Sequence, residues 1–245
     1  MSDLVRVGLV IEGVTDYVLI RAIIGKLLGG REFVTNVLQP EFSEAFVAQG
    51  SRGSGWAGVH RWCRQSSEQG GGGEGRYGKS RESFAFVTND VVVVHLDADV
   101  ASKKYSDENI AYPKNDLPCV EPCPPARGST DALRGVCLGW LGEDERPLRL
   151  VFCTPSKSSG AWVMAAFFPR NKVMREQGFE CYPDPDSQLA VQKKDRRVKK
   201  NRSDYERIAA DFAEKWPEVR RAMTEAERFA AEFSACIGAV DRARG

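Results

Sequence analysis

Residues 90–99 read DVVVVHLDAD, and their four consecutive valines form the strongest strand pattern in the chain. An unbroken run of β-branched residues predicts a strand buried on both faces, as in a parallel sheet that helices cover on either side. The strand leads directly into Asp97 and Asp99. Because residues two apart on an extended chain face the same side, these two carboxylates can present their oxygens together.

A second buried strand is predicted at residues 5–11, VRVGLVI, which Glu12 ends. Apolar residues then recur at helical spacing over 15–28, where a glycine pair ends the helix. The same patterns predict further elements in this order: strand 33–38, helix 60–67, helix 130–140, strand 148–153, helix 160–168, and one or two amphipathic helices within 205–233. Alternating strands and helices predict an α/β fold with a mainly parallel, Rossmann-like sheet flanked by helices.

The predicted organisation is an α/β domain over residues 1–190, followed by a basic, helical C-terminal extension over 191–245. Two insertions interrupt the domain. The first, at about 66–80, contains four consecutive glycines and is predicted to be a mobile loop, because no Gly-Lys-Ser/Thr sequence opens a helix there as in a phosphate-binding loop. The second, at about 103–127, is rich in proline and is predicted to be irregular.

The composition excludes some classes of protein. The formal net charge of +1 gives no global attraction to nucleic acid or to a membrane, so any such attraction must be local. Glu12 and Asp16 interrupt the apolar stretch near the N-terminus, which argues against a signal peptide, and no run approaches the roughly 18 apolar residues of a membrane span. The seven scattered cysteines predict a reducing cytoplasm and buried thiols instead of a disulfide framework.

Three carboxylates follow the two strongest strands, namely Glu12, Asp97 and Asp99, and Asp16 lies one turn into the helix after the first strand. In open α/β sheets, sites form at the carboxyl ends of the strands. Carboxylates that converge repel one another unless a cation neutralises them, and oxygen ligands favour Mg²⁺ or Mn²⁺. The sequence therefore predicts a divalent-metal site at this edge of the sheet.

The segments Val10–Asp16 and Val94–Asp99 resemble the two Toprim motifs, a strand ending in Glu-Gly and a strand ending in Asp-x-Asp. The chain is most similar to small standalone Toprim proteins related to the overcoming-lysogenisation-defect nucleases. Residues 154–157 (TPSK) and Ala161-Trp162 resemble the proline-containing turn and Ala-Trp helix of that group. The resemblance implies a nuclease, in some systems paired with an ATPase in phage defence.

The resemblance also implies roles for individual residues. Asp97 and Asp99 would bind the cation, Glu12 would bind metal or act as a general acid or base, and Asp16 would serve a second metal. One position departs from the pattern, because the relatives have Glu immediately before Ala-Trp and this chain has Gly160. We therefore expect a weakened site, in which Gly160→Glu would raise activity or metal affinity.

Other interpretations remain open at this point. Sugar-nucleotide transferases and haloacid-dehalogenase-like phosphatases also place Asp-x-Asp after a strand, although Val100 and Ala101 fit the phosphatases poorly. Asp16 could simply complement the helix dipole. Cys119 and Cys123 have a spacing that one zinc knuckle permits, but no clear second pair follows, so structural thiols are favoured.

The preferred function is a Mg²⁺- or Mn²⁺-dependent nuclease in which Lys157 offsets charge on the scissile phosphate. Residues 193–202, KKDRRVKKNR, hold seven basic residues that could bind a polyanion, with DNA favoured over RNA. A homo-oligomer is left open, and the main alternative function is an inactive Toprim subunit of an ATPase complex. The predicted nucleic-acid-binding residues are Lys193, Lys194, Arg196, Arg197, Lys199 and Lys200.

Overall fold

The computed structural model describes residues 4–40, 53–70 and 84–244. Its centre is a four-stranded sheet in the order β2-β1-β3-β4, in which every neighbouring pair is parallel. This topology confirms the predicted parallel α/β fold. The strands are β1 (Val5–Val10), β2 (Phe33–Gln39), β3 (Val91–His95) and β4 (Leu150–Cys153), close to the four strands that the sequence predicts.

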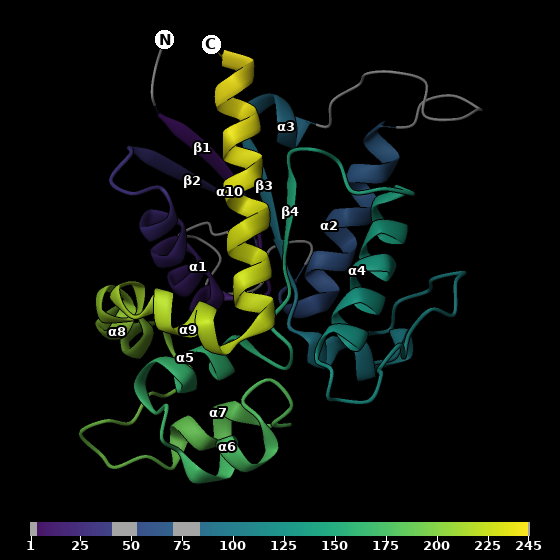
Figure 1. Ribbon diagram of the computed structural model, residues 1–245. Coiled ribbons are helices and arrows are strands. Elements are labelled where there is room, and N and C mark those ends of the chain that lie inside the picture. The colour runs from purple at the N-terminus through teal and green to yellow at the C-terminus, as the bar shows by residue number, and fades with distance from the viewer. Residues whose placement is uncertain (1–3, 41–52, 71–83, 245) are drawn as a thin grey trace.

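Side chains of β3 point alternately to two hydrophobic layers. Val91 and Val93 belong to the layer beneath α1, α8 and α10, whereas Val92 and Val94 belong to the layer beneath α2 and α4. Figure 1 shows these two groups of helices on opposite sides of the sheet. The helices are α1 (Val14–Leu27), α2 (Gly55–Gly70), α4 (Arg127–Leu141), α8 (Arg202–Glu214) and α10 (Thr224–Arg244).

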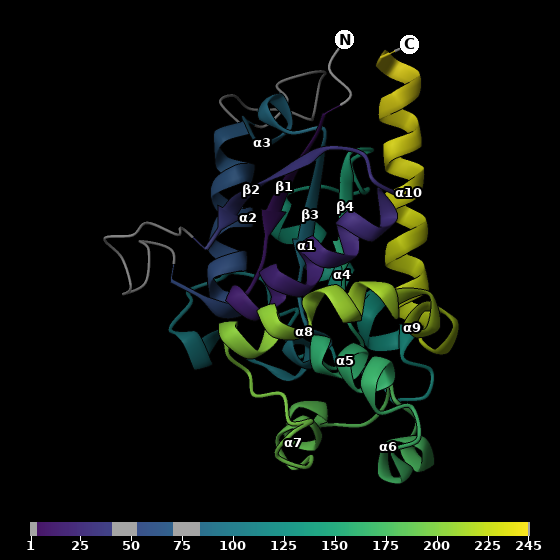
Figure 2. The ribbon, with the colours of Figure 1, turned by 90° about the vertical axis from the view of Figure 1, so that its left-hand side faces the viewer.

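Shorter elements complete the described chain. Helices α5, α6 and α7 lie beyond the carboxyl ends of the strands, in the lower part of Figure 2. The sequence patterns did not predict α3, α6 or α7, which are too short to show a helical period. The bounds are α3 (Phe84–Thr88), η1 (Ala98–Ser102), η2 (Tyr105–Glu108), α5 (Ser159–Phe167), α6 (Lys172–Gln177), α7 (Pro185–Ala190) and α9 (Trp216–Ala222).

Helix α2 corrects two predictions about the region before β3. It begins at Gly55 and continues to Gly70, so it is longer than the helix predicted at 60–67. Residues 66–70, predicted as the start of a mobile loop, belong to its last turns, because Trp56, Val59 and Cys63 anchor one face of the helix in the core. The remainder of that predicted insertion, 71–80, lies outside the described residues.

The C-terminal region is helical, as predicted, but it contains three helices where one or two were expected. Its basic run at 193–201 lies ahead of α8, which begins at Arg202 with Asn201 as its N-cap. Trp216, Phe229 and Phe233 are fully buried, and Trp216 packs against Trp162 of α5 with ring centroids 5.2 Å apart. Helices α8, α9 and α10 therefore share one hydrophobic core with the sheet. Within the part of the chain that the structure describes, no helix is long and apolar enough to cross a membrane.

The expectation of free thiols is wrong for one pair of cysteines. Cys123, in the proline-rich insertion, is disulfide-bonded to Cys181, because the end of that insertion packs beside the residues that follow α6. Cys123 therefore cannot join Cys119 as a zinc ligand in this structure. The cysteines that stay free are Cys63, Cys119, Cys137, Cys153 and Cys236.

Candidate metal centre

Glu12 and Asp97 meet at the carboxyl ends of β1 and β3. The two strands are neighbours, with Val10 paired to Val94, so the residues that follow them emerge side by side. The backbone N–H of Asp97 donates a hydrogen bond of 2.7 Å to Glu12 Oε1. Asp97 is buried and Glu12 is partly buried. The structure thus brings together two of the three predicted strand-end carboxylates.

The first turn of α5 holds two of the acids in place. The backbone N–H of Ser159 donates to Asp97 Oδ1 at 3.0 Å, and its hydroxyl donates to Asp16 Oδ1 at 2.8 Å. Asp16 is buried on α1. The N-terminus of a helix carries partial positive charge, so α5 stabilises the carboxylate of Asp97. Ser159 is a residue that the sequence patterns did not single out.

His95 is the second residue that sequence reasoning missed. It is the last residue of β3 and fully buried, and its Nε2 lies 3.3 Å from Asp97 Oδ1 and 4.0 Å from Asp16 Oδ1. That approach suits an ion pair but lacks the alignment of a hydrogen bond, so both ring nitrogens are without a hydrogen-bond partner. The signal was present in the sequence, because His95 stands two positions before Asp97, on the same side of an extended chain.

A compact donor set results from this arrangement. Glu12, His95 and Asp97 each offer one ligand atom, and these three atoms lie within 4.8 Å of one another. Among the residues that the structure describes, no other group of three or more His, Cys, Asp or Glu side chains has its ligand atoms this close together. Asp99 is not part of the group. A carboxylate pair with one imidazole is a donor set that divalent transition-metal ions accept.

Burial and mutual repulsion raise the pKa values of the acids in this group, and a nearby cation would stabilise their charged forms. The pKa of Glu12 is raised well above its ordinary value, first by burial and then by Asp97. Burial also raises the pKa of Asp97 to about 6, against the opposing effect of His95. Burial lowers the pKa of His95, but Asp16, Asp97 and Glu12 together raise it to about 9. An imidazolium here therefore supplies one positive charge to three acids.

Asp99 lies in η1, next to the group. Its backbone N–H donates to the carbonyl of Lys157 at 3.2 Å, and its side chain is exposed. Partial burial nevertheless raises the pKa of Asp99. Lys103 and Lys200 oppose this rise, and Asp186 adds to it. The predicted role of Asp99 as a metal ligand stays a prediction, as does the catalytic role of Lys157, whose backbone carbonyl accepts this hydrogen bond.

The predicted nucleic-acid-binding residues separate into two groups. Three have partners within the chain: Arg196 donates to the carbonyl of Phe167 at 3.0 Å, Arg197 to that of Gln192 at 3.4 Å, and Lys200 pairs with Asp186 at 3.1 Å. The side chains of the other three, Lys193, Lys194 and Lys199, are exposed, as are those of Arg196 and Lys200. Because Arg196, Arg197 and Lys200 already have partners, Lys193, Lys194 and Lys199 are the better candidates for contact with a polyanion.

Gly160 has a structural reason to be glycine. It lies buried in the first turn of α5, and a Cβ there would collide with Asp186 Oδ1 and lie 3.0 Å from Asp186 Cγ. The carboxylate of Asp186 already occupies the space into which a side chain at position 160 would grow, so a glutamate there would have to displace Asp186. The expected gain in activity or metal affinity from Gly160→Glu stays a prediction.

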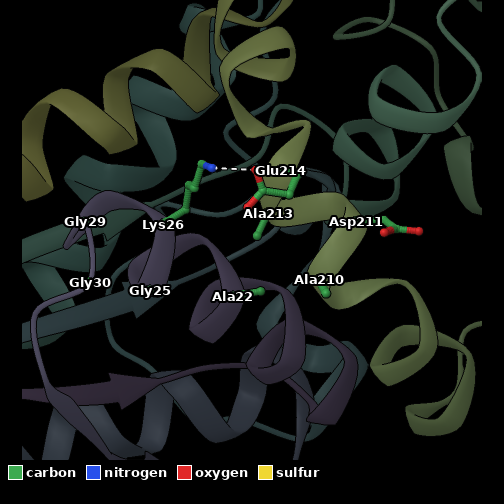
Figure 3. Close-up of a pocket in the computed structure, with 9 residues that line it drawn as sticks. All are labelled: Ala22, Gly25, Lys26, Gly29, Gly30, Ala210, Asp211, Ala213 and Glu214. Atoms are coloured by element: carbon green, nitrogen blue, oxygen red, sulfur yellow. Dashed lines mark hydrogen bonds and ion pairs between the residues drawn. The ribbon is translucent and has the colours of Figure 1, made fainter.

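A groove elsewhere on the surface contains none of these acids. It lies between α1 and α8, has small residues along its floor, and is bordered by the ion pair of Lys26 with Glu214 at 2.7 Å (Figure 3).

Comparison of the chain with protein-family models, with curated proteins and with solved structures finds no match.

Proposed function

We propose that this chain is a Toprim-like, divalent-metal-dependent hydrolase of nucleic-acid phosphodiesters, with its metal centre at Glu12 and Asp97. The observation that carries the proposal is the meeting of these two carboxylates, from separate strands, beside buried Asp16 and His95. Several buried acids on one sheet edge cost folding free energy, and a bound cation would offset that cost.

The side chains present fit a metal ion. Glu12 and Asp97 supply oxygen donors, and the ring nitrogens of His95 have no hydrogen-bond partner, although His95 is fully buried. Because a nitrogen donor suits transition-metal ions better than Mg²⁺, we expect Mn²⁺ to bind more tightly than Mg²⁺. His95 must lose its proton to coordinate, so binding should release protons.

A bound divalent cation would supply Lewis-acid stabilisation of the phosphate and would lower the pKa of water. The chain's own residues would orient the metal-binding acids, transfer a proton and bind the nucleic acid. Ser159 holds Asp97 and Asp16 in fixed orientations. Glu12, whose pKa is raised by burial and by Asp97, is suited to carry a proton to or from a reacting oxygen. The exposed lysines 193, 194 and 199 would hold the polyanion near the site.

The test is a cleavage assay on single-stranded DNA, duplex DNA and RNA, with Mg²⁺ and with Mn²⁺. We expect metal-dependent cleavage by the wild type and its loss in Asp97→Asn, while Asp211→Asn, an exposed acid on α8, keeps wild-type activity. Cleavage that Asp97→Asn leaves intact would refute the metal mechanism. Metal binding without cleavage of any substrate would favour a regulatory subunit. A nucleotide sugar is assayed as a further substrate, and turnover of it alone would favour a transferase.

The proposed ATPase partner rests on the resemblance to Toprim proteins. The assay should therefore be repeated with any ATPase that co-purifies with the chain. Cleavage that appears only with this partner and ATP would make the chain the effector of a two-component system.

A further inference from the structure

Asp186, on α7, lies against the first turn of α5. Its Oδ2 accepts hydrogen bonds from the hydroxyl of Ser158 and from the ammonium of Lys200, both at 3.1 Å. Its Oδ1 is buried and has no hydrogen-bond partner. A carboxylate oxygen that is shielded from water and left without a donor is suited to accept a cation.

The position of Asp186 is set by its neighbours on α5. The absence of a side chain at Gly160 lets the carboxylate approach the helix, since a Cβ there would collide with Oδ1. Ser158, whose hydroxyl binds Asp186, immediately precedes Ser159, whose N–H binds Asp97. The N-cap residue and the first residue of α5 thus hold Asp186 and Asp97 at the same helix end.

Lys200 is the cation that pairs with Asp186 in the structure. Its ammonium lies 3.1 Å from Asp186 Oδ2, and half of its side chain is exposed to solvent. In the structure it supplies positive charge where a metal ion would also supply it.

Tyr205 points independently to a ligand at this place. Its side chain is fully buried on α8, and its hydroxyl has no hydrogen-bond partner. Burial raises the pKa of the phenol, and nearby carboxylates raise it further, those of Asp186, Asp16 and Asp97. A fully buried hydroxyl without a partner is suited to bind an oxygen of a ligand at this place.

We propose that Asp186 is a further metal-binding carboxylate of this centre, and that Lys200 is its counter-ion only while the metal is absent. This inference rests on the proposed metal centre and adds to it a ligand from a segment distant in sequence. It also assigns Gly160 the role of leaving room for that ligand.

The experiment is calorimetric titration of the full chain with Mn²⁺, without nucleic acid. Asp186→Asn should weaken Mn²⁺ binding at least about tenfold, because an amide keeps the shape but loses the charge. Lys200→Met should strengthen binding, because the metal no longer competes with the ammonium. The two substitutions should therefore change Mn²⁺ affinity in opposite directions. If Asp186 and Lys200 formed only a structural ion pair, both variants would change Mn²⁺ affinity in the same direction. Asp211→Asn serves as the control for removal of an acid and should bind like the wild type.

Gly160→Ala supplies a second route to the same conclusion. Its Cβ should displace Asp186 and weaken Mn²⁺ binding, whereas Gly135→Ala, in α4 with no atom within 4 Å of the added Cβ, should leave binding unchanged. Unchanged affinity in Asp186→Asn, or weaker binding in Lys200→Met, would overturn the role of Asp186. If Asp97→Asn also binds Mn²⁺ normally, or if the wild type binds none, the metal centre itself is refuted and the role of Asp186 with it.

Discussion

The backbone N–H of Asp97 lies 2.7 Å from Glu12 Oε1, although 85 positions separate the two residues in the chain. This contact exists because β1 and β3 are neighbours in a parallel sheet, which places their carboxyl ends together. The backbone of Asp97 therefore orients the carboxylate of Glu12. A change to either residue should therefore alter the geometry of both.

Ser159→Ala should destabilise the protein by about 1–3 kcal/mol, because the hydroxyl that satisfies buried Asp16 is lost while the backbone bond to Asp97 remains. Urea unfolding without metal measures the change. Ser187→Ala, which removes an exposed hydroxyl bonded to a backbone carbonyl, is the matched control and should change stability little. Equal effects of the two substitutions would contradict the bridging role of Ser159.

His60 gives a prediction of pH dependence away from the metal centre. It packs in an aromatic cluster, 5.1 Å from the ring of Trp140, and burial, Arg64 and Arg61 lower its pKa from 6.5 to about 4. Below pH 6.5 the unfolded chain binds this proton more readily than the folded chain. Stability should therefore fall as pH falls from 6.5 to about 4, by at most about 1.4 kcal/mol per pH unit from this group.

The comparison that isolates His60 is between wild type and His60→Phe. Other acids titrate in the same window, and only the difference between the two pH profiles belongs to this residue. Unfolding free energies measured from pH 7 to pH 4 should diverge, with the variant losing less stability. Parallel profiles would mean that His60 accepts a proton in the folded protein as easily as in the unfolded chain.

Arg134 should be the strongest side-chain link between α4 and α10. It is buried, and it binds Glu232 at 2.7 Å, Thr154 at 2.7 Å and, more distantly, Glu225 at 3.6 Å. Arg134→Met removes the more buried of the two arginines that pair with these acids, while Arg228 stays 3.2 Å from Glu232 and 3.7 Å from Glu225, so it should cost up to about 3–5 kcal/mol. Arg127→Met, which breaks an exposed pair with Asp131, should cost under about 0.5 kcal/mol in the same denaturation experiment.

Neutralising the exposed lysines 193, 194 and 199 should weaken nucleic-acid binding and flatten its salt dependence, by up to roughly 0.9 in the logarithmic slope per lost phosphate contact. Removing three exposed arginines elsewhere, Arg127, Arg221 and Arg242, makes the same change in net charge and serves as the control. If both triple variants bind equally well, the basic run does not contact the polyanion.

Strand patterns were enough to predict most of the sheet. The valines of β3 need burial on both faces, and that need alone places helices on either side. The candidate site was predictable where it follows strand ends, as at Glu12 and Asp97. His95 was within reach of the same reasoning, because it shares a side of the chain with Asp97.

The rest of the site depends on tertiary contacts that leave no local pattern. Asp186 reaches α5 from a short helix, and neither spacing nor periodicity connects it with Gly160. The glycine therefore looked like a missing carboxylate in the sequence, whereas the structure gives it a neighbour that needs the space. Cys123 and Cys181 are a similar case, since the turns of two irregular segments bring them together.

The central claim is that Glu12 and Asp97 hold one divalent cation, and a double-mutant cycle of Mn²⁺ affinity tests it most directly. Calorimetric titrations of wild type, Glu12→Gln, Asp97→Asn and the double variant give four binding free energies. If both residues bind the same ion, each single variant should lose most of the affinity, and the double variant should lose little more than either. Wild-type affinity in both single variants, or losses that simply add, would contradict a shared metal centre.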